Sequence, residues 1–155
     1  MNSKESTRKT MISRALRNEN SADPVAVVFD AYAWVEYALD GLSSEIVKER
    51  LDNASEAFTP ASVIAELKES MLRHKVRKRI IHQMISFVKG KSSVVEIDSR
   101  IAELAGEVNF HRKKTVKDWG MLDSLVFSVS IMKKARLLTG DPHFKDLSNV
   151  IYIGK

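Results

Sequence analysis

Two acidic residues stand at the ends of apolar segments, where carboxylates can take part in chemistry. Asp30 directly follows the apolar residues 25–29, and Asp141 follows the short apolar segment 137–139 and one glycine. Because open parallel sheets place their ligands at the carboxyl ends of the strands, these two acids can share one crevice if their strands are neighbours. The alternatives are that Asp30 caps the helix after it and that Asp141 belongs to an ordinary Asp-Pro turn.

Asp123 is the least expected acid, because it interrupts the apolar residues 119–127 of a predicted helix. Aspartate is a poor former of helix interiors, and a buried carboxylate is costly unless it is paired or bound to a metal. The alternative is that Asp123 is the N-cap of a helix that starts late. Glu66 lies beside an apolar helical stripe, where spacing alone favours an ordinary surface position. Asp118 is predicted to be a helix N-cap and is a candidate fifth acid.

Clustered carboxylates repel one another, so a cluster of these acids needs a cation. Ligands that offer only oxygen select magnesium or manganese over zinc. Hard cations held in this way support in-line displacement at phosphorus by a metal-activated water. The four histidines show no metal-ligand spacing among themselves and are predicted to be surface or turn residues: His74, His82, His111 and His143.

Basic residues gather in two stretches that contain no acid. Residues 73–91 hold seven Lys or Arg, and residues 111–117 hold four more, in a chain of net charge +5. Basic surface around an acidic centre suits an enzyme that processes a polyanion, although either stretch alone is explained as well by a solvated helix face. The candidate contacts to the polyanion are Arg77, Lys78, Arg112, Lys113, Lys114 and Lys117.

The length and composition describe one globular domain. The chain has 155 residues, 44% of them hydrophobic, and no cysteine, which excludes disulfides and thiolate metal sites. Residues 1–23 are predicted to be a flexible basic tail, and residues 24–155 the folded domain. No apolar run is long enough to cross a membrane, and the N-terminus lacks the apolar segment of a secretory signal, so we expect a cytoplasmic protein.

Short apolar segments alternate with helical patterns along the domain, which predicts an α/β fold with a parallel sheet and right-handed crossovers. The predicted strands are residues 25–29, 57–58, 94–97, 137–139 and 150–153. The predicted helices are residues 31–39, 44–51, one that begins at residue 61, then 76–88, 99–110 and 118–134, with residues 112–117 as a loop.

Four segments taken together resemble the PIN domain, most closely that of the VapC-type toxin ribonucleases. The segments are Val-Val-Phe-Asp30-Ala-Tyr, Thr-Pro-Ala-Ser-Val-Ile-Ala-Glu66-Leu, Leu-Asp123-Ser-Leu-Val-Phe-Ser-Val-Ser and Leu-Leu-Thr139-Gly-Asp141-Pro-His-Phe. Each segment is a weak signal alone, but their order and spacing are specific. The resemblance extends over residues 25–153.

The resemblance implies a five-stranded parallel sheet between helices, and it implies that Asp30, Glu66, Asp123 and Asp141 bind Mg²⁺ or Mn²⁺. Thr139 and Ser124 would be supporting hydroxyl groups. It implies cleavage of single-stranded RNA, a homodimer, and an antitoxin partner whose tail enters the acidic groove.

Three other functions compete with this interpretation. One is a catalytically weak PIN domain that binds RNA or protein, and another is an RNA-processing PIN nuclease outside a toxin-antitoxin system. The third is a phosphatase of the haloacid-dehalogenase type. It is disfavoured because Tyr32 stands where that chemistry needs a second acid.

Overall fold

The computed structural model describes residues 25–155, so the predicted tail of residues 1–23 lies outside the described part of the chain. The strands are β1 (Val27–Phe29), β2 (Ala57–Pro60), β3 (Ser93–Val95), β4 (Arg136–Thr139) and β5 (Val150–Tyr152). The helices are α2 (Ala31–Ala38), α3 (Ser44–Asn53), α4 (Ala61–Arg73), α5 (Lys78–Lys91), α6 (Ser99–Arg112), α7 (Met121–Met132) and the 3-10 helix η1 (Pro142–Phe144). Among the described helices, none has the length and apolarity that a bilayer span requires.

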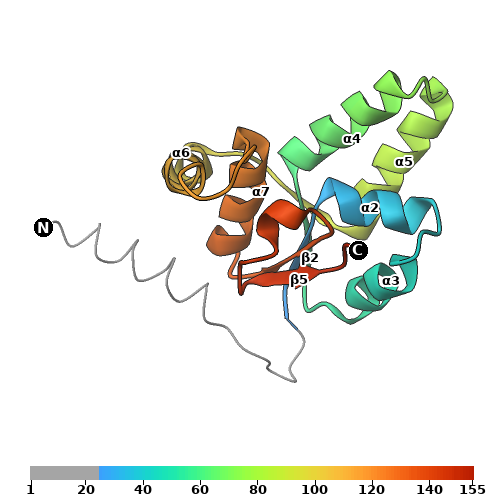
Figure 1. The fold of residues 1–155 in the computed structure, drawn as a ribbon. Coiled ribbons are helices and arrows are strands. Elements are labelled where there is room, and N and C mark those ends of the chain that lie inside the picture. The colour runs from blue at the N-terminus through green and yellow to red at the C-terminus, as the bar shows by residue number, and fades with distance from the viewer. Residues whose placement is uncertain (1–24) are drawn as a thin grey trace, which may run out of the picture.

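The five strands form one sheet in the order β3-β2-β1-β4-β5, and every pair of neighbours is parallel. Helices cover the sheet, with α6 and α7 on one side of Figure 1 and α2 and α3 on the other. This arrangement confirms the predicted α/β fold with a five-stranded parallel sheet. Strand β1 lies at the centre, and Phe29 pairs in register with Leu138 of β4.

The central strand is buried on both faces because its sequence is apolar without interruption. Val28 and Phe29 are fully buried. Trp34 of α2 packs on Phe29 with ring centroids 5.2 Å apart, and its Nε1 donates to Thr59 Oγ1 at 3.1 Å. The indole therefore fills the core and still satisfies its polar atom. Trp34 thus packs against the last residue of β1, directly before Asp30.

Helix α7 begins at Met121, so the prediction of a helix opening at Asp118 is wrong. Asp118 has a left-handed backbone, with φ 62°, which a continuing α-helix does not permit. Trp119 is buried and packs on Phe144 at a centroid distance of 4.9 Å. Burial of this indole brings the chain inward before the helix starts.

Other boundaries differ from the predicted ones by a few residues. The basic helix predicted at residues 76–88 is α5 at 78–91, and the strand predicted at 94–97 is β3 at 93–95. Helix α6 continues to Arg112, which was predicted to lie in a loop. The guanidinium of Arg112 pairs with Asp146, 34 residues later, and this long-range contact accompanies the additional turn.

Candidate metal centre

Asp30 is both a helix cap and a buried acid at the sheet edge. Its Oδ1 accepts the backbone N–H of Ala33 at 3.0 Å, which caps α2. Its Oδ2 accepts the hydroxyl of Thr139, which ends the neighbouring strand β4. Thr139 Oγ1 in turn accepts the N–H of Asp141 at 3.0 Å. Asp30 can therefore cap α2 and belong to the acidic site at the same time. Thr139 links Asp30 to Asp141, the acid that follows the neighbouring strand.

Asp141 opens the 3-10 helix η1 directly after β4. Its Oδ1 accepts the backbone N–H of His143 at 2.8 Å, an Asx turn that Pro142 favours. The side chain of Asp141 remains about one-third exposed, at 34%. Strands β1 and β4 are parallel neighbours, so Asp30 and Asp141 lie at the same carboxyl end of the sheet. The sequence predicted a shared crevice for these two acids if their strands were neighbours, and they are.

Asp123 lies in the first turn of α7, not in the middle of a helix. Its Oδ2 accepts the N–H of Gly120 at 2.8 Å, so it satisfies a free donor at the helix start. The late start of the helix, raised as an alternative, is thus part of the explanation. Its side chain is 22% exposed, and the Oδ2 that accepts the Gly120 N–H also lies 4.0 Å from His143 Nδ1, so the oxygen that caps the helix also faces the site.

The acids lie close enough together for the charges of their neighbours to raise the pKa values of Asp30, Glu66 and Asp123. Burial raises the pKa of Asp30 to about 7, and the charges of Glu66 and Asp141 contribute to the rise. Desolvation followed by the charges of Asp123 and Asp141 raises the pKa of Glu66, although Glu66 is an exposed residue of α4. Desolvation and the charge of Asp141 raise the pKa of Asp123. The predicted acids thus form one electrostatic cluster, and among residues 25–155 no cationic side chain lowers the pKa of Asp30 or Glu66.

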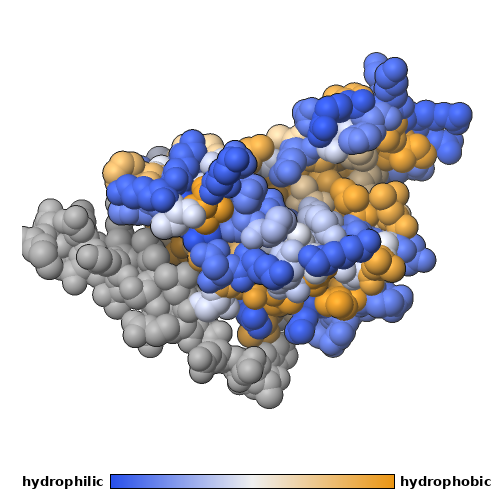
Figure 2. All heavy atoms as spheres, in the orientation of Figure 1, coloured by the Kyte–Doolittle hydropathy of each residue, from blue (hydrophilic) through white to orange (hydrophobic). Residues whose placement is uncertain are grey.

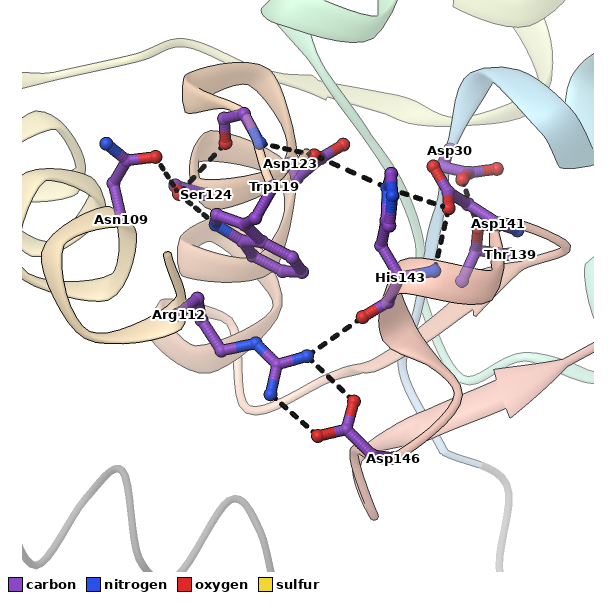
Figure 3. Close-up of polar contacts among 11 residues, drawn as sticks. Asp30, Asn109, Arg112, Trp119, Asp123, Ser124, Thr139, Asp141, His143 and Asp146 are labelled. Atoms are coloured by element: carbon purple, nitrogen blue, oxygen red, sulfur yellow. Dashed lines mark hydrogen bonds and ion pairs between the residues drawn. The ribbon is translucent and has the colours of Figure 1, made fainter. Parts of the chain in front are cut away.

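His143 is the residue that the sequence analysis missed. Its Nδ1 lies 3.2 Å from Asp141 Oδ1 and 4.0 Å from Asp123 Oδ2. Figure 3 shows the imidazole between these two carboxylates. One ligand atom from each of the three side chains lies within 4.8 Å of the others. The available signal was its place two residues after Asp141, in the turn that follows β4.

The guanidinium of Arg112 makes its hydrogen bonds within the protein. Its two terminal nitrogens bind both carboxylate oxygens of Asp146 at 2.7 Å, and Nη2 also donates to the carbonyl of His143 at 2.8 Å. Its guanidinium lies 4.7 Å from the Trp119 ring centroid. With 14% of its side chain exposed, Arg112 is a positioning residue for η1 and a poor candidate for contact with a polyanion.

The other candidates differ in their surroundings. Ser124 is buried, and its hydroxyl accepts the Nε1–H of Trp119 at 2.7 Å, so it supports the start of α7. Asp118 is exposed and lies outside the group of three residues that could hold a metal ion, Asp123, Asp141 and His143. The remaining basic candidates are all exposed: Arg77, Lys78, Lys113, Lys114 and Lys117.

The structure is a parallel α/β sheet in which Asp30 and Asp141 follow neighbouring strands, at the carboxyl ends where open α/β sheets bind ligands. The PIN domain family model matches residues 27–150, and the chain belongs to that family, a family of nucleases that generally use a divalent metal. A search of curated protein sequences gave no match.

Solved structures share the fold at low sequence identity. VapBC2 from Rickettsia felis, bound to a DNA fragment from the promoter, is 18% identical with a TM-score of 0.67, over 83% of this chain and 98% of that chain. DNA-bound VapBC from Salmonella typhimurium is 13% identical with a TM-score of 0.63, over 84% and 98%. VapC20 from Mycobacterium tuberculosis, described as a sarcin-ricin loop cleaving toxin, is 14% identical with a TM-score of 0.54, over 71% and 85%.

Proposed function

We propose that this protein is a metal-dependent endoribonuclease that cleaves single-stranded RNA. One observation carries the proposal: Asp30, Glu66, Asp123 and Asp141 form a single cluster in which three pKa values are raised. Holding these like charges together opposes folding unless a cation balances them. Membership of the PIN domain family supports the same conclusion.

The donor set fits a hard divalent cation, Mg²⁺ or Mn²⁺. Asp30, Glu66, Asp123 and Asp141 offer carboxylate oxygens, which these ions prefer. When bound, such a cation supplies the acidity that activates the attacking water and the charge that balances the phosphate. Asp30 is oriented by Thr139 and the Ala33 N–H, and Asp123 by the Gly120 N–H. These hydrogen bonds orient the carboxylates of Asp30 and Asp123 before a metal ion or an RNA phosphodiester binds.

The direct test is an RNA cleavage assay on the purified protein. We expect a single-stranded RNA of mixed sequence to be cut internally with Mn²⁺ or Mg²⁺, and to remain intact with excess EDTA. A fluorescent label at each end, read on a denaturing gel, separates internal cuts from trimming at an end. RNA binding without turnover at any metal concentration would instead support the catalytically weak binding module.

We further propose that the protein is the toxin of a toxin-antitoxin pair, acts in the cytoplasm and forms a homodimer. The solved structures that share its fold include toxin-antitoxin complexes.

Large apolar side chains are exposed on α2, α3 and the turn between them, and such clusters mark protein interfaces: Val35, Leu39, Leu42 and Ile46. Figure 2 shows hydrophobic residues gathered below the α4–α5 hairpin, where Figure 1 places α2. Light scattering on the purified chain would measure the dimer.

Lys113 and Lys114 are proposed to contact the RNA backbone. Both are exposed, and Lys114 Nζ lies 4.0 Å from the ring centroid of Phe110, itself 62% exposed. We expect the variant Lys113→Ala with Lys114→Ala to bind RNA more weakly. The slope of log affinity against log salt should become shallower by about 0.7 for each phosphate that the variant no longer binds, because fewer counterions are released.

The matched control is Lys48→Ala, which removes an exposed lysine from α3. The control should leave the salt slope unchanged, because only lysines that contact phosphate release counterions on binding. Fluorescence anisotropy at several salt concentrations gives both slopes. Equal slopes for the wild type and the double variant would remove the 113–117 segment from the RNA surface.

A further inference from the structure

The imidazole of His143 has a buried nitrogen without a hydrogen-bond partner among the described residues. The atom is Nδ1, which solvent does not reach, although the side chain as a whole is 31% exposed. It lies 3.2 Å from Asp141 Oδ1 and 4.0 Å from Asp123 Oδ2, yet neither contact has hydrogen-bond geometry. A buried polar atom without a partner is costly, so its orientation toward two carboxylates needs an explanation.

The backbone on both sides of this ring is held in place. The N–H of His143 donates to Asp141 Oδ1 at 2.8 Å, and its carbonyl accepts from Arg112 Nη2 at 2.8 Å. Arg112 is itself fixed by its bidentate pair with Asp146. Figure 3 shows these contacts, which come from α6 and η1, and the ring lying between Asp123 and Asp141. The backbone position from which the imidazole extends is therefore set by the fold.

We propose that His143 Nδ1 is a nitrogen ligand of the cation that Asp123 and Asp141 bind. The inference rests on the proposed metal-dependent function and extends it, because it makes the site a mixed nitrogen and oxygen site. A neutral imidazole with its hydrogen on Nε2 offers a lone pair at Nδ1. One cation within reach of all three side chains would satisfy the nitrogen and balance both carboxylates.

A nitrogen ligand changes which ions the site prefers. Imidazole suits nickel, zinc and other later transition metals, whereas magnesium prefers oxygen and keeps much of its water. His143 should therefore strengthen binding of Co²⁺ and Ni²⁺ strongly, Mn²⁺ less, and Mg²⁺ least. The competing role for His143 is a positive charge paired with Asp141. That role makes the opposite prediction, because removal of a nearby cation would strengthen the binding of every metal ion.

Calorimetric titration of the whole chain with Mg²⁺, Mn²⁺, Co²⁺ and Ni²⁺ tests the proposal without an activity assay. The variants are His143→Ala and His143→Gln, and the second keeps a polar side chain if the first folds poorly. We expect Co²⁺ and Ni²⁺ affinity to fall by at least about 10-fold. Mutation of a residue that only supports a metal ligand already lowers metal affinity by about 10-fold to 100-fold, and loss of a ligand should cost at least as much. Mg²⁺ affinity should change by less than about 3-fold, because magnesium gains least from imidazole.

Pulsed electron paramagnetic resonance on the Mn²⁺-loaded protein gives a second readout. A ¹⁴N coupling from a bound nitrogen should be present in the wild type and absent in His143→Gln. His82→Ala is the control for nonspecific binding, because His82 is exposed on the basic helix α5. This variant should retain wild-type affinities for all four ions.

Two outcomes would overturn the inference: equal changes for all four ions, or unchanged Co²⁺ and Ni²⁺ affinity in both His143 variants. Asp141→Asn separates this failure from failure of the proposed function. If Asp141→Asn weakens all four ions while the His143 variants bind as the wild type does, the site binds metal through oxygen alone. If Asp141→Asn also binds all ions as the wild type does, the site at Asp123, Asp141 and His143 is not where the ions bind, and the cleavage assay with and without EDTA decides separately whether the protein is a metal-dependent nuclease.

Discussion

Asp30→Asn and Asp123→Asn are each expected to lower metal-dependent RNA cleavage by at least about 100-fold. Mutation of residues that only support metal ligands lowers activity by up to about 100-fold, and a change in a ligand itself should cost at least that much. Without metal, each variant should be at least as thermally stable as the wild type. The reason is that asparagine removes one like charge from a cluster whose pKa values are raised by burial and mutual repulsion. It also keeps an oxygen that can accept the N–H of Ala33 or of Gly120.

Thermal melts with and without Mn²⁺, beside one cleavage assay, provide the measurement. The matched control is Asp98→Asn, since Asp98 caps α6 through the Ile101 N–H at 2.9 Å just as Asp30 caps α2. Asp98→Asn should cleave RNA at the wild-type rate. If Asp30 were only a cap, Asp30→Asn would behave like this control. A wild-type cleavage rate in Asp30→Asn would defeat the site assignment.

In the absence of metal, the free energy of unfolding should decrease as the pH rises from about 4 to above 7. Asp30 has an ordinary pKa of 3.8 and a pKa of about 7 in the folded protein. The folded state therefore holds a proton on Asp30 that the unfolded state has released, and this stabilisation is lost as the pH passes the folded pKa. For a shift of this size the loss over the whole range is on the order of 4 kcal/mol. The raised pKa values of Glu66 and Asp123 act in the same direction.

Urea unfolding in EDTA at about pH 5 and about pH 8 measures this loss, and the two pH values span most of the titration. Asp30→Asn should show a much smaller difference between them. The lowered pKa of Asp146, which accepts hydrogen bonds from Arg112, acts in the opposite direction, but only as the pH falls below its usual range. A wild-type protein that is equally stable at both pH values would show that Asp30 is ionised without penalty when it is folded.

Local sequence patterns determined the sheet and two of the acids. The apolar run before Asp30 predicts a strand covered on both faces, and the structure has the fully buried β1 there. Alternation of short apolar segments with helical periodicity predicts a parallel sheet, because parallel strands need crossovers. Since the end of a strand is a local feature, Asp30 and Asp141 could be identified without knowing which strands are neighbours.

The tertiary structure alone decided which residues meet. The order β3-β2-β1-β4-β5 brings Asp30 beside Thr139, 109 residues away. Burial of Trp119 against Phe144 accompanies the late start of α7 and the position of Asp123 in its first turn. The contact of Arg112 with the carbonyl of His143 depends on a helix 31 residues earlier. Periodicity reports only the neighbours along one element, so it contains no signal for the packing that directs His143 toward two carboxylates.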